Sequence, residues 1–188
     1  MESFLASFAS VGLAEIGDRT QILTLLLASR FKKPFTVIAG IFLATFVNHV
    51  IAGELGAWIS EHVGRNFLRY VLAASFLVTA LWMLKPEKVS KEDTKIKPYG
   101  AFLASFVAFF LAEIGDKTQI ITAQLAAEFH NIPAVVGGTV LGMMAANVPV
   151  VFMSGILTKN LPIRLIRIIA AIIFAILGVA ALFNIHGS

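Results

Sequence analysis

The hydrophobic positions of this 188-residue chain gather in six long apolar stretches, which short polar segments separate. About 20 apolar residues are needed for a helix to cross the hydrocarbon core of a bilayer, and such a stretch is too long for a strand of a membrane barrel. The polar segments carry charged residues and prolines. The pattern therefore predicts an all-α integral membrane protein with six transmembrane helices, near residues 4–28, 34–59, 66–84, 100–127, 133–157 and 162–184.

The composition agrees with a membrane protein and excludes several other classes. Hydrophobic residues make up 58% of the chain and charged residues 14%, whereas soluble domains have about 25% charged residues. Mean hydropathy is +0.86. The absence of cysteine excludes disulfides and thiolate metal ligands. A net charge of +4, spread over short loops, does not indicate nucleic-acid binding.

One polar motif occurs twice within the apolar pattern. Residues 4–24 read FLASFASVGLAEIGDRTQILT and residues 102–122 read FLASFVAFFLAEIGDKTQIIT, so that 15 of 21 positions are identical at an offset of 98. Three residue pairs further along the chain match at an offset of 99, which we interpret as an insertion in the first loop. These pairs are Pro34 with Pro133, Asn48 with Asn147, and Gly56 with Gly155.

The repeat predicts how the chain is organised. Residues 1–84 form a first three-helix repeat, residues 85–98 a linker, and residues 99–188 a second three-helix repeat. Because each half has an odd number of spans, the second half enters the membrane from the opposite side. The two halves are therefore predicted to be inverted-topology repeats, an arrangement suited to alternating access.

Lysine and arginine in the loops predict the orientation in the membrane. Counted together with the first six residues of the following span, the loops after the first, third and fifth spans contain eleven such residues, and the other two loops contain two. Since basic residues favour the cytoplasmic side, we expect the linker in the cytoplasm and both termini on the extracytoplasmic side.

The duplicated motif supplies the candidate chemistry. In a continuous helix, its Glu, Asp and Gln fall at i, i+3 and i+6 and lie along one face, so each motif is predicted to line one wall of a shared site. The glycine between Glu and Asp tolerates a bend. Oxygen donors suit Mg²⁺, Ca²⁺ or Mn²⁺, and the lack of Cys or clustered His argues against Zn²⁺ and Cu⁺. The predicted cation ligands are Glu15, Asp18, Gln21, Asn48, Glu113, Asp116, Gln119 and Asn147.

The remaining polar residues of the motif are expected to serve gating or charge balance. Arg19 and Lys117 are unsuited as ligands because they repel a cation, but they can neutralise the carboxylates when the site is empty. Thr20 and Thr118 place hydroxyl groups nearby. Clustered carboxylates cannot all stay ionised without a cation, so loss of the metal favours uptake of protons. Exchange of metal for protons at one site follows.

The duplicated E-x-G-D-[KR]-[TS] signature in a six-span chain resembles the Gdt family of manganese and calcium transporters. The resemblance covers essentially the whole chain and is greatest to the small bacterial exporters of the MneA type. It implies secondary transport of Mn²⁺, or of Ca²⁺, across a bacterial plasma membrane with protons as the counter-ion. It also implies that Glu15, Asp18, Glu113 and Asp116 form the core of the site, with the metal as substrate and no permanently bound cofactor.

Two other functions and one structural role remain open at this stage. A six-helix exporter of another solute would have fewer acids and some hydrophobic contacts in its site. An intramembrane aspartyl enzyme needs two asymmetric acids, whereas both motifs repeat in full here, so an enzyme is not expected. As a structural alternative, Glu15 can pair with Arg19, and Glu113 with Lys117, at a spacing of i+4. No sequence feature indicates the oligomeric state.

Overall fold

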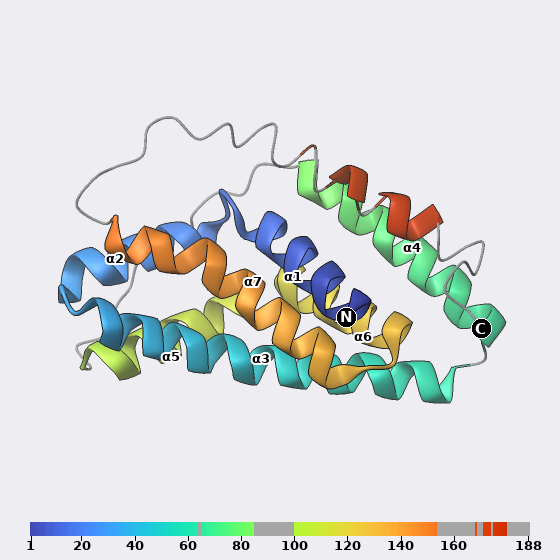
Figure 1. Ribbon diagram of the computed structural model, residues 1–188, viewed down its shortest axis with the longest axis horizontal. Helices are drawn as coiled ribbons and strands as arrows, with labels where there is room; N and C mark the ends of the chain where they lie inside the picture. The colour runs from blue at the N-terminus through green and yellow to red at the C-terminus, as the bar shows by residue number, and fades with distance from the viewer. Residues whose placement is uncertain (64, 85–99, 154–167, 169–170, 174, 180–188) are drawn as a thin grey trace.

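The computed structural model describes residues 1–63, 65–84, 100–153, 168, 171–173 and 175–179 (Figure 1). Within these ranges the prediction of an all-α fold is confirmed. The linker 85–98 and most of the sixth predicted span lie outside the described residues. The helices with defined bounds are α1 (Glu2–Glu15), α2 (Arg19–Phe31), α3 (Pro34–His62), α4 (Arg65–Leu84), α5 (Ala101–Glu113), α6 (Lys117–Phe129) and α7 (Ile132–Phe152).

The first and fourth predicted spans are each divided into two shorter helices. The prediction of one continuous helix through each motif is therefore wrong. Gly17 and Gly115 have φ angles of 77° and 71°, a left-handed conformation that glycine adopts without the steric cost of a Cβ atom. These glycines end α1 and α5 and redirect the chain into α2 and α6.

Among the described residues, two helices are long and apolar enough to cross a membrane, judged by length and composition. They are α3 with 29 residues and α7 with 21 residues, lengths of about 43 Å and about 31 Å at 1.5 Å per residue. Large apolar side chains such as Phe35, Trp58 and Leu81 are exposed, whereas polar side chains such as Thr45 and Asn48 are buried. Apolar residues outside and polar residues inside suit a protein that lipid surrounds.

The helix packing repeats between the two halves of the chain. Helix α1 packs on α7, and its counterpart α5 packs on α3; likewise α2 contacts α7 while α6 contacts α3. The colour gradient in Figure 1 shows α3 and α7 running in opposite directions along the long axis. Each half thus supports the broken helices of the other half.

Matching glycines allow these close contacts. A Cβ atom on Gly40 would lie 2.6 Å from the carbonyl oxygen of Phe102, and one on Gly138 would lie 2.4 Å from the carbonyl oxygen of Phe4. Both glycines therefore bring helix backbones together at distances that no other residue permits. The two contacts are related by the offset of 98.

The register between the halves differs from the sequence-based prediction. Lys32 and His130 end α2 and α6 with the same φ of 51°, and the next residues, Lys33 and Asn131, have φ of −127° and −130°. The two loops therefore have equal length, and the predicted insertion in the first loop is wrong. Structurally equivalent positions of the two halves are 98 residues apart, and we call this the structural register. Residue pairs that match at an offset of 99 are therefore displaced by one residue from equivalent positions.

The glycine contacts lead to a testable expectation. Gly138→Ala should lower the stability of the detergent-purified protein by about 1–3 kcal/mol, because the added methyl group collides with the backbone of α1. The adjacent Gly137 provides a matched control, since a Cβ atom there would lie 3.7 Å from the ring of Phe4. Thermal unfolding of the two variants measures the difference. Equal melting temperatures would contradict the close packing of α1 on α7.

Helix α4 lies beside the bundle and contacts α6. Gln124 of α6 donates to the hydroxyl of Thr79 at 3.1 Å. On its other side, Ala73 and Leu77 lie within 3.4 Å of the Cβ position of Gly178 in the C-terminal helical residues (Figure 1). The described part of the C-terminal segment therefore packs on α4.

Candidate functional site

Four acidic side chains of the two motifs are buried where the broken helices meet. Glu15 and Glu113 are the last residues of α1 and α5, and both are 0% exposed. Asp18 and Asp116 are the N-caps of α2 and α6, and each is 1% exposed. Ion pairs join the two motifs, since Arg19 lies 3.1 Å from Asp116 and Lys117 lies 2.7 Å from Asp18.

The aspartates hold the starts of α2 and α6. Asp18 accepts a hydrogen bond from the backbone N–H of Arg19 at 2.7 Å, and Asp116 accepts one from the backbone N–H of Thr118 at 3.5 Å. A side-chain oxygen at the N-cap satisfies backbone donors that the first turn of a helix leaves unpaired. The Asp of the motif therefore has a local structural function besides its charge.

The glutamines brace the same breaks. The Oε1 atoms of Gln21 and Gln119 accept hydrogen bonds from the backbone N–H groups of Gly17 and Gly115, both at 2.8 Å. These N–H groups have left the helical hydrogen-bond ladder, and a backbone donor without a partner is costly away from water. In this structure the glutamines therefore stabilise the breaks, and their function as cation ligands stays a prediction.

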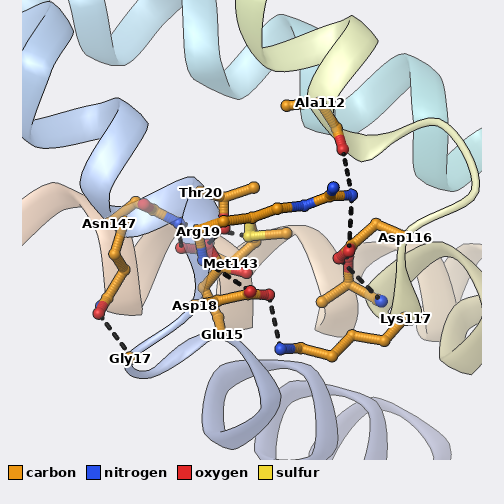
Figure 2. Close-up of polar contacts among 12 residues, drawn as sticks. Glu15, Gly17, Asp18, Arg19, Thr20, Ala112, Asp116, Lys117, Met143 and Asn147 are labelled. Atoms are coloured by element: carbon orange, nitrogen blue, oxygen red, sulfur yellow. Dashed lines mark hydrogen bonds and ion pairs between the residues drawn. The ribbon is translucent and has the colours of Figure 1, made fainter. Parts of the chain in front are cut away.

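Glu15 is held by side chains from both halves (Figure 2). Its Oε1 atom accepts from the hydroxyl of Thr20 and, at 2.8 Å, from Nδ2 of Asn147. Its Oε2 atom is buried and has no hydrogen-bond partner among the described residues. The described hydrogen-bond partners of Glu15 are thus a hydroxyl and an amide, and one carboxylate oxygen remains available to a ligand.

Glu113 has a similar environment supplied by α3. Its Oε1 atom accepts from the hydroxyl of Thr45 at 2.9 Å, and its Oε2 atom accepts from Nδ2 of Asn48 at 3.3 Å. An amide from the opposite half therefore contacts the Glu of each motif. Asn48 and Asn147, predicted as ligands, both reach the site.

The motif cations cross between the halves and pair with the aspartates. Nζ of Lys117 lies 2.7 Å from Oδ2 of Asp18, and Nη2 of Arg19 lies 3.1 Å from Oδ1 of Asp116 (Figure 2). Arg19 also donates to the carbonyl oxygen of Ala112 at 2.9 Å, near the C-terminal end of α5, where a positive charge is favourable. These pairs differ from the structural alternative, which joined each cation to the Glu of its own motif.

The predicted ligands form two neighbouring half-sites rather than one coordination sphere. Among the described residues, no group of three Asp, Glu or His side chains is arranged to hold one metal ion. We define the first half-site as Glu15, Thr20, Met143 and Asn147, and the second as Glu113, Thr45 and Asn48. The ion pairs of the aspartates connect the two half-sites.

Sequence reasoning missed several polar contacts of α3 and α7. Thr45 precedes Asn48 by three residues, and this i, i+3 spacing on one helix face is a signal that could have identified it. His49 is 0% exposed and its Nδ1 atom lies 3.5 Å from the hydroxyl of Thr122. The matching threonine of the first half, Thr24, donates to Oδ1 of Asn147 at 2.7 Å. In the structural register His49 therefore corresponds to Asn147.

Known proteins resemble this chain over nearly its whole length. The family described as "Divalent cation/proton antiporter GDT1" matches residues 3–91 and 101–187. A protein of Vibrio cholerae named "Putative manganese exporter" is 46% identical over 184 residues, which cover 97% of this chain and 92% of that protein. The chain is also 27% identical to "GDT1-like protein 3" of Arabidopsis thaliana over 209 residues, covering 97% of this chain and 71% of the relative.

A cyanobacterial relative, "GDT1-like protein sll0615" of Synechocystis, is 24% identical over 205 residues and is covered over 97% of its length. No solved structure has significant similarity to the chain. The family match extends over nearly the whole sequence and includes both motifs, each of which places buried acidic side chains at a helix break. The chain belongs to the GDT1 family of divalent cation/proton antiporters, which are membrane transporters and not enzymes.

Proposed function

We propose that this protein exports Mn²⁺ across a bacterial plasma membrane in exchange for protons, by alternating access. The family supplies the class of reaction, since its members exchange divalent cations for protons. The name of the Vibrio cholerae relative supports manganese as the cation. Under this proposal Ca²⁺ is the second candidate substrate, because oxygen ligands accept both ions.

One observation carries the proposal: Glu15 and Glu113 are fully buried, and their described hydrogen-bond partners are hydroxyl and amide groups. A buried carboxylate is costly unless a positive charge or a proton neutralises it. A divalent cation can neutralise both glutamates, and protons can neutralise them when the cation leaves. Competition between metal and protons for the same oxygens is the basis of exchange.

The ion pairs of the aspartates suit the metal-free state of the proposed transport cycle, in which metal and protons bind in turn. Lys117 and Arg19 supply the positive charge that Asp18 and Asp116 need when no metal is present. An entering cation competes with these side chains for the carboxylates, so metal binding is coupled to rearrangement at the contact between the halves. We propose Glu15, Asp18, Asn147, Glu113, Asp116 and Asn48 as ligands along this path, with Gln21 and Gln119 joining once they release the glycines.

The proposed membrane arrangement is six spans in two inverted three-helix repeats. The exchanged packing of α1 on α7 and α5 on α3, and the opposite directions of α3 and α7, support it. The loop charges favour both termini on the extracytoplasmic side. In this arrangement the broken helices lie near the middle of the membrane, where discontinuous helices bind ions in other transporters.

Flux through proteoliposomes with an imposed pH gradient tests the proposed function. Purified protein should move Mn²⁺ out of a compartment when the opposite side is made acidic, and the flux should stop when the gradient is dissipated. Ca²⁺ and Mg²⁺ are compared under the same conditions. Absence of flux for every divalent cation, in protein that elutes as a single folded species, would reject the proposal.

Acidification should weaken Mn²⁺ binding. Protons occupy the same carboxylate oxygens as the metal, so a lower pH raises the Mn²⁺ concentration needed for half-maximal binding. One competing proton changes that concentration by about tenfold per pH unit in the range where the site titrates. Equilibrium binding of Mn²⁺ to detergent-purified protein between about pH 6 and pH 8 measures this dependence. A pH-independent affinity would contradict exchange at a shared site.

A further inference from the structure

The two half-sites differ chemically at one position in the structural register. Thr45 of α3 and Met143 of α7 are related by the offset of 98, the offset that also relates Gly40 to Gly138. Thr45 gives the second half-site a hydroxyl group, which donates to Glu113. Met143 gives the first half-site a thioether. One half-site is therefore built from oxygen and amide groups, and the other also contains sulfur.

The thioether lies next to the polar groups of the first half-site. Met143 is 0% exposed, and its Sδ atom lies 3.3 Å from Nδ2 of Asn147. The same Nδ2 atom donates to Oε1 of Glu15 at 2.8 Å, and the Oε2 atom of Glu15 has no hydrogen-bond partner among the described residues. Figure 2 shows Met143 among Glu15, Thr20 and Asn147. Sulfur and an available carboxylate oxygen thus belong to the same buried group of side chains.

Sulfur changes which cations such a site favours. Mg²⁺ and Ca²⁺ are hard ions that take oxygen ligands in proteins, so a thioether offers them little. Transition-metal ions also accept nitrogen and sulfur ligands, to a degree that grows with their softness. A site that replaces one hydroxyl with a thioether therefore loses a ligand for the alkaline-earth ions and retains one for transition metals.

We propose that Met143 is a specificity-determining residue, whose sulfur contacts the transported cation beside Glu15 and favours Mn²⁺ over Ca²⁺ and Mg²⁺. The proposal rests on the proposed function, in which Glu15 binds the transported ion. It assigns selectivity to the asymmetry between the half-sites, because the motif acids themselves are the same in both. A methionine that only fills space in the core predicts no effect on the choice of metal.

Two substitutions separate these possibilities. Met143→Thr copies the second half-site and should strengthen competition by Ca²⁺ against Mn²⁺ by about tenfold, the effect of exchanging one metal contact. Met143→Leu retains most of the side-chain volume but removes the sulfur. It should weaken binding of Mn²⁺, and more strongly that of the softer Cd²⁺, while leaving Ca²⁺ affinity within about twofold of the wild type.

The experiment measures inhibition of Mn²⁺ flux by Ca²⁺, Mg²⁺ and Cd²⁺ in proteoliposomes, together with dissociation constants for the same ions in detergent. Met144→Leu is the matched control, since Met144 is the adjacent buried methionine and lies outside both half-sites. Thermal unfolding of each variant identifies any that fail to fold. If the folded Met143→Leu protein keeps the wild-type ratio of Mn²⁺ to Ca²⁺ affinity, the inference is overturned. If wild-type protein moves no divalent cation, the proposed function itself fails.

Discussion

Glu15→Gln is expected to abolish proton-driven Mn²⁺ transport, with a fall in flux of roughly 100-fold or more. The substitution removes the charge and the site of protonation but keeps the shape of the side chain. The glutamine Oε1 atom can still accept from Thr20 and Asn147, and the new amide group replaces an oxygen that lacks a hydrogen-bond partner among the described residues. The protein should therefore fold normally while it loses exchange.

Glu113→Gln should have the same effect on flux but a larger effect on folding. Both oxygens of Glu113 accept hydrogen bonds, from Thr45 and from Asn48. The new amide group therefore either faces the Nδ2 donor of Asn48 or requires the hydroxyl of Thr45 to accept instead of donate. Flux in proteoliposomes and thermal unfolding in detergent separate the two consequences. Glu61→Gln, an exposed residue near the end of α3, is the control and should transport at the wild-type rate. Wild-type flux in Glu15→Gln would show that this carboxylate does not bind the exchanged ions.

Asp18→Asn is expected to destabilise the protein by about 3–5 kcal/mol, because it leaves the buried ammonium group of Lys117 without its carboxylate. The side chains of this pair are 0% and 7% exposed, and their charged atoms lie 2.7 Å apart. Asparagine is as good an N-cap as aspartate, so the start of α2 keeps its local stabilisation. The loss therefore reports the ion pair between the halves rather than the cap.

A double-mutant cycle identifies the partner. Lys117→Met alone should cost a similar amount, since it leaves the Asp18 carboxylate buried, and Asp18→Asn combined with Lys117→Met should recover most of the loss. Chemical unfolding in detergent gives the free energies, with Glu61→Gln expected to change stability by less than about 0.5 kcal/mol. Strictly additive losses in the double variant would contradict the pairing of Lys117 with Asp18.

Much of the fold was predictable because its signals are local. Within the described residues, runs of apolar residues predicted where helices occur, although the first and fourth runs are each divided into two helices. The duplicated motif predicted that residues 98 apart have equivalent surroundings. The glycine of the motif was interpreted as tolerating a bend. The sequence did not show that Gly17 would adopt a left-handed φ. Within an apolar run, the residues around a glycine do not distinguish a glycine that continues a helix from one that ends it.

The contacts of the candidate site were harder to predict because they join distant parts of the chain. The i+4 spacing suggested that Arg19 pairs with Glu15, yet once α1 ends at Glu15 the two residues no longer share a helix face. Arg19 instead reaches Asp116, 97 residues away. Similarly, two asparagines at an offset of 99 appeared equivalent, whereas the packing follows an offset of 98. Both the partner of Arg19 and the offset between equivalent helices depend on tertiary packing, which local sequence patterns do not show.

The crossed ion pairs also affect how the protein is made. Residues are added from the N-terminus, so Asp18 and Arg19 enter the membrane before Lys117 and Asp116 have been synthesised. During that interval the nascent first half lacks the partners that stabilise these charges in the finished protein. Docking of the second half supplies both partners in one event, which gives late assembly a strong thermodynamic drive. A chain that stops short of the second motif lacks both ion pairs between the halves, so its first half should be less stable than the same segment in the full protein.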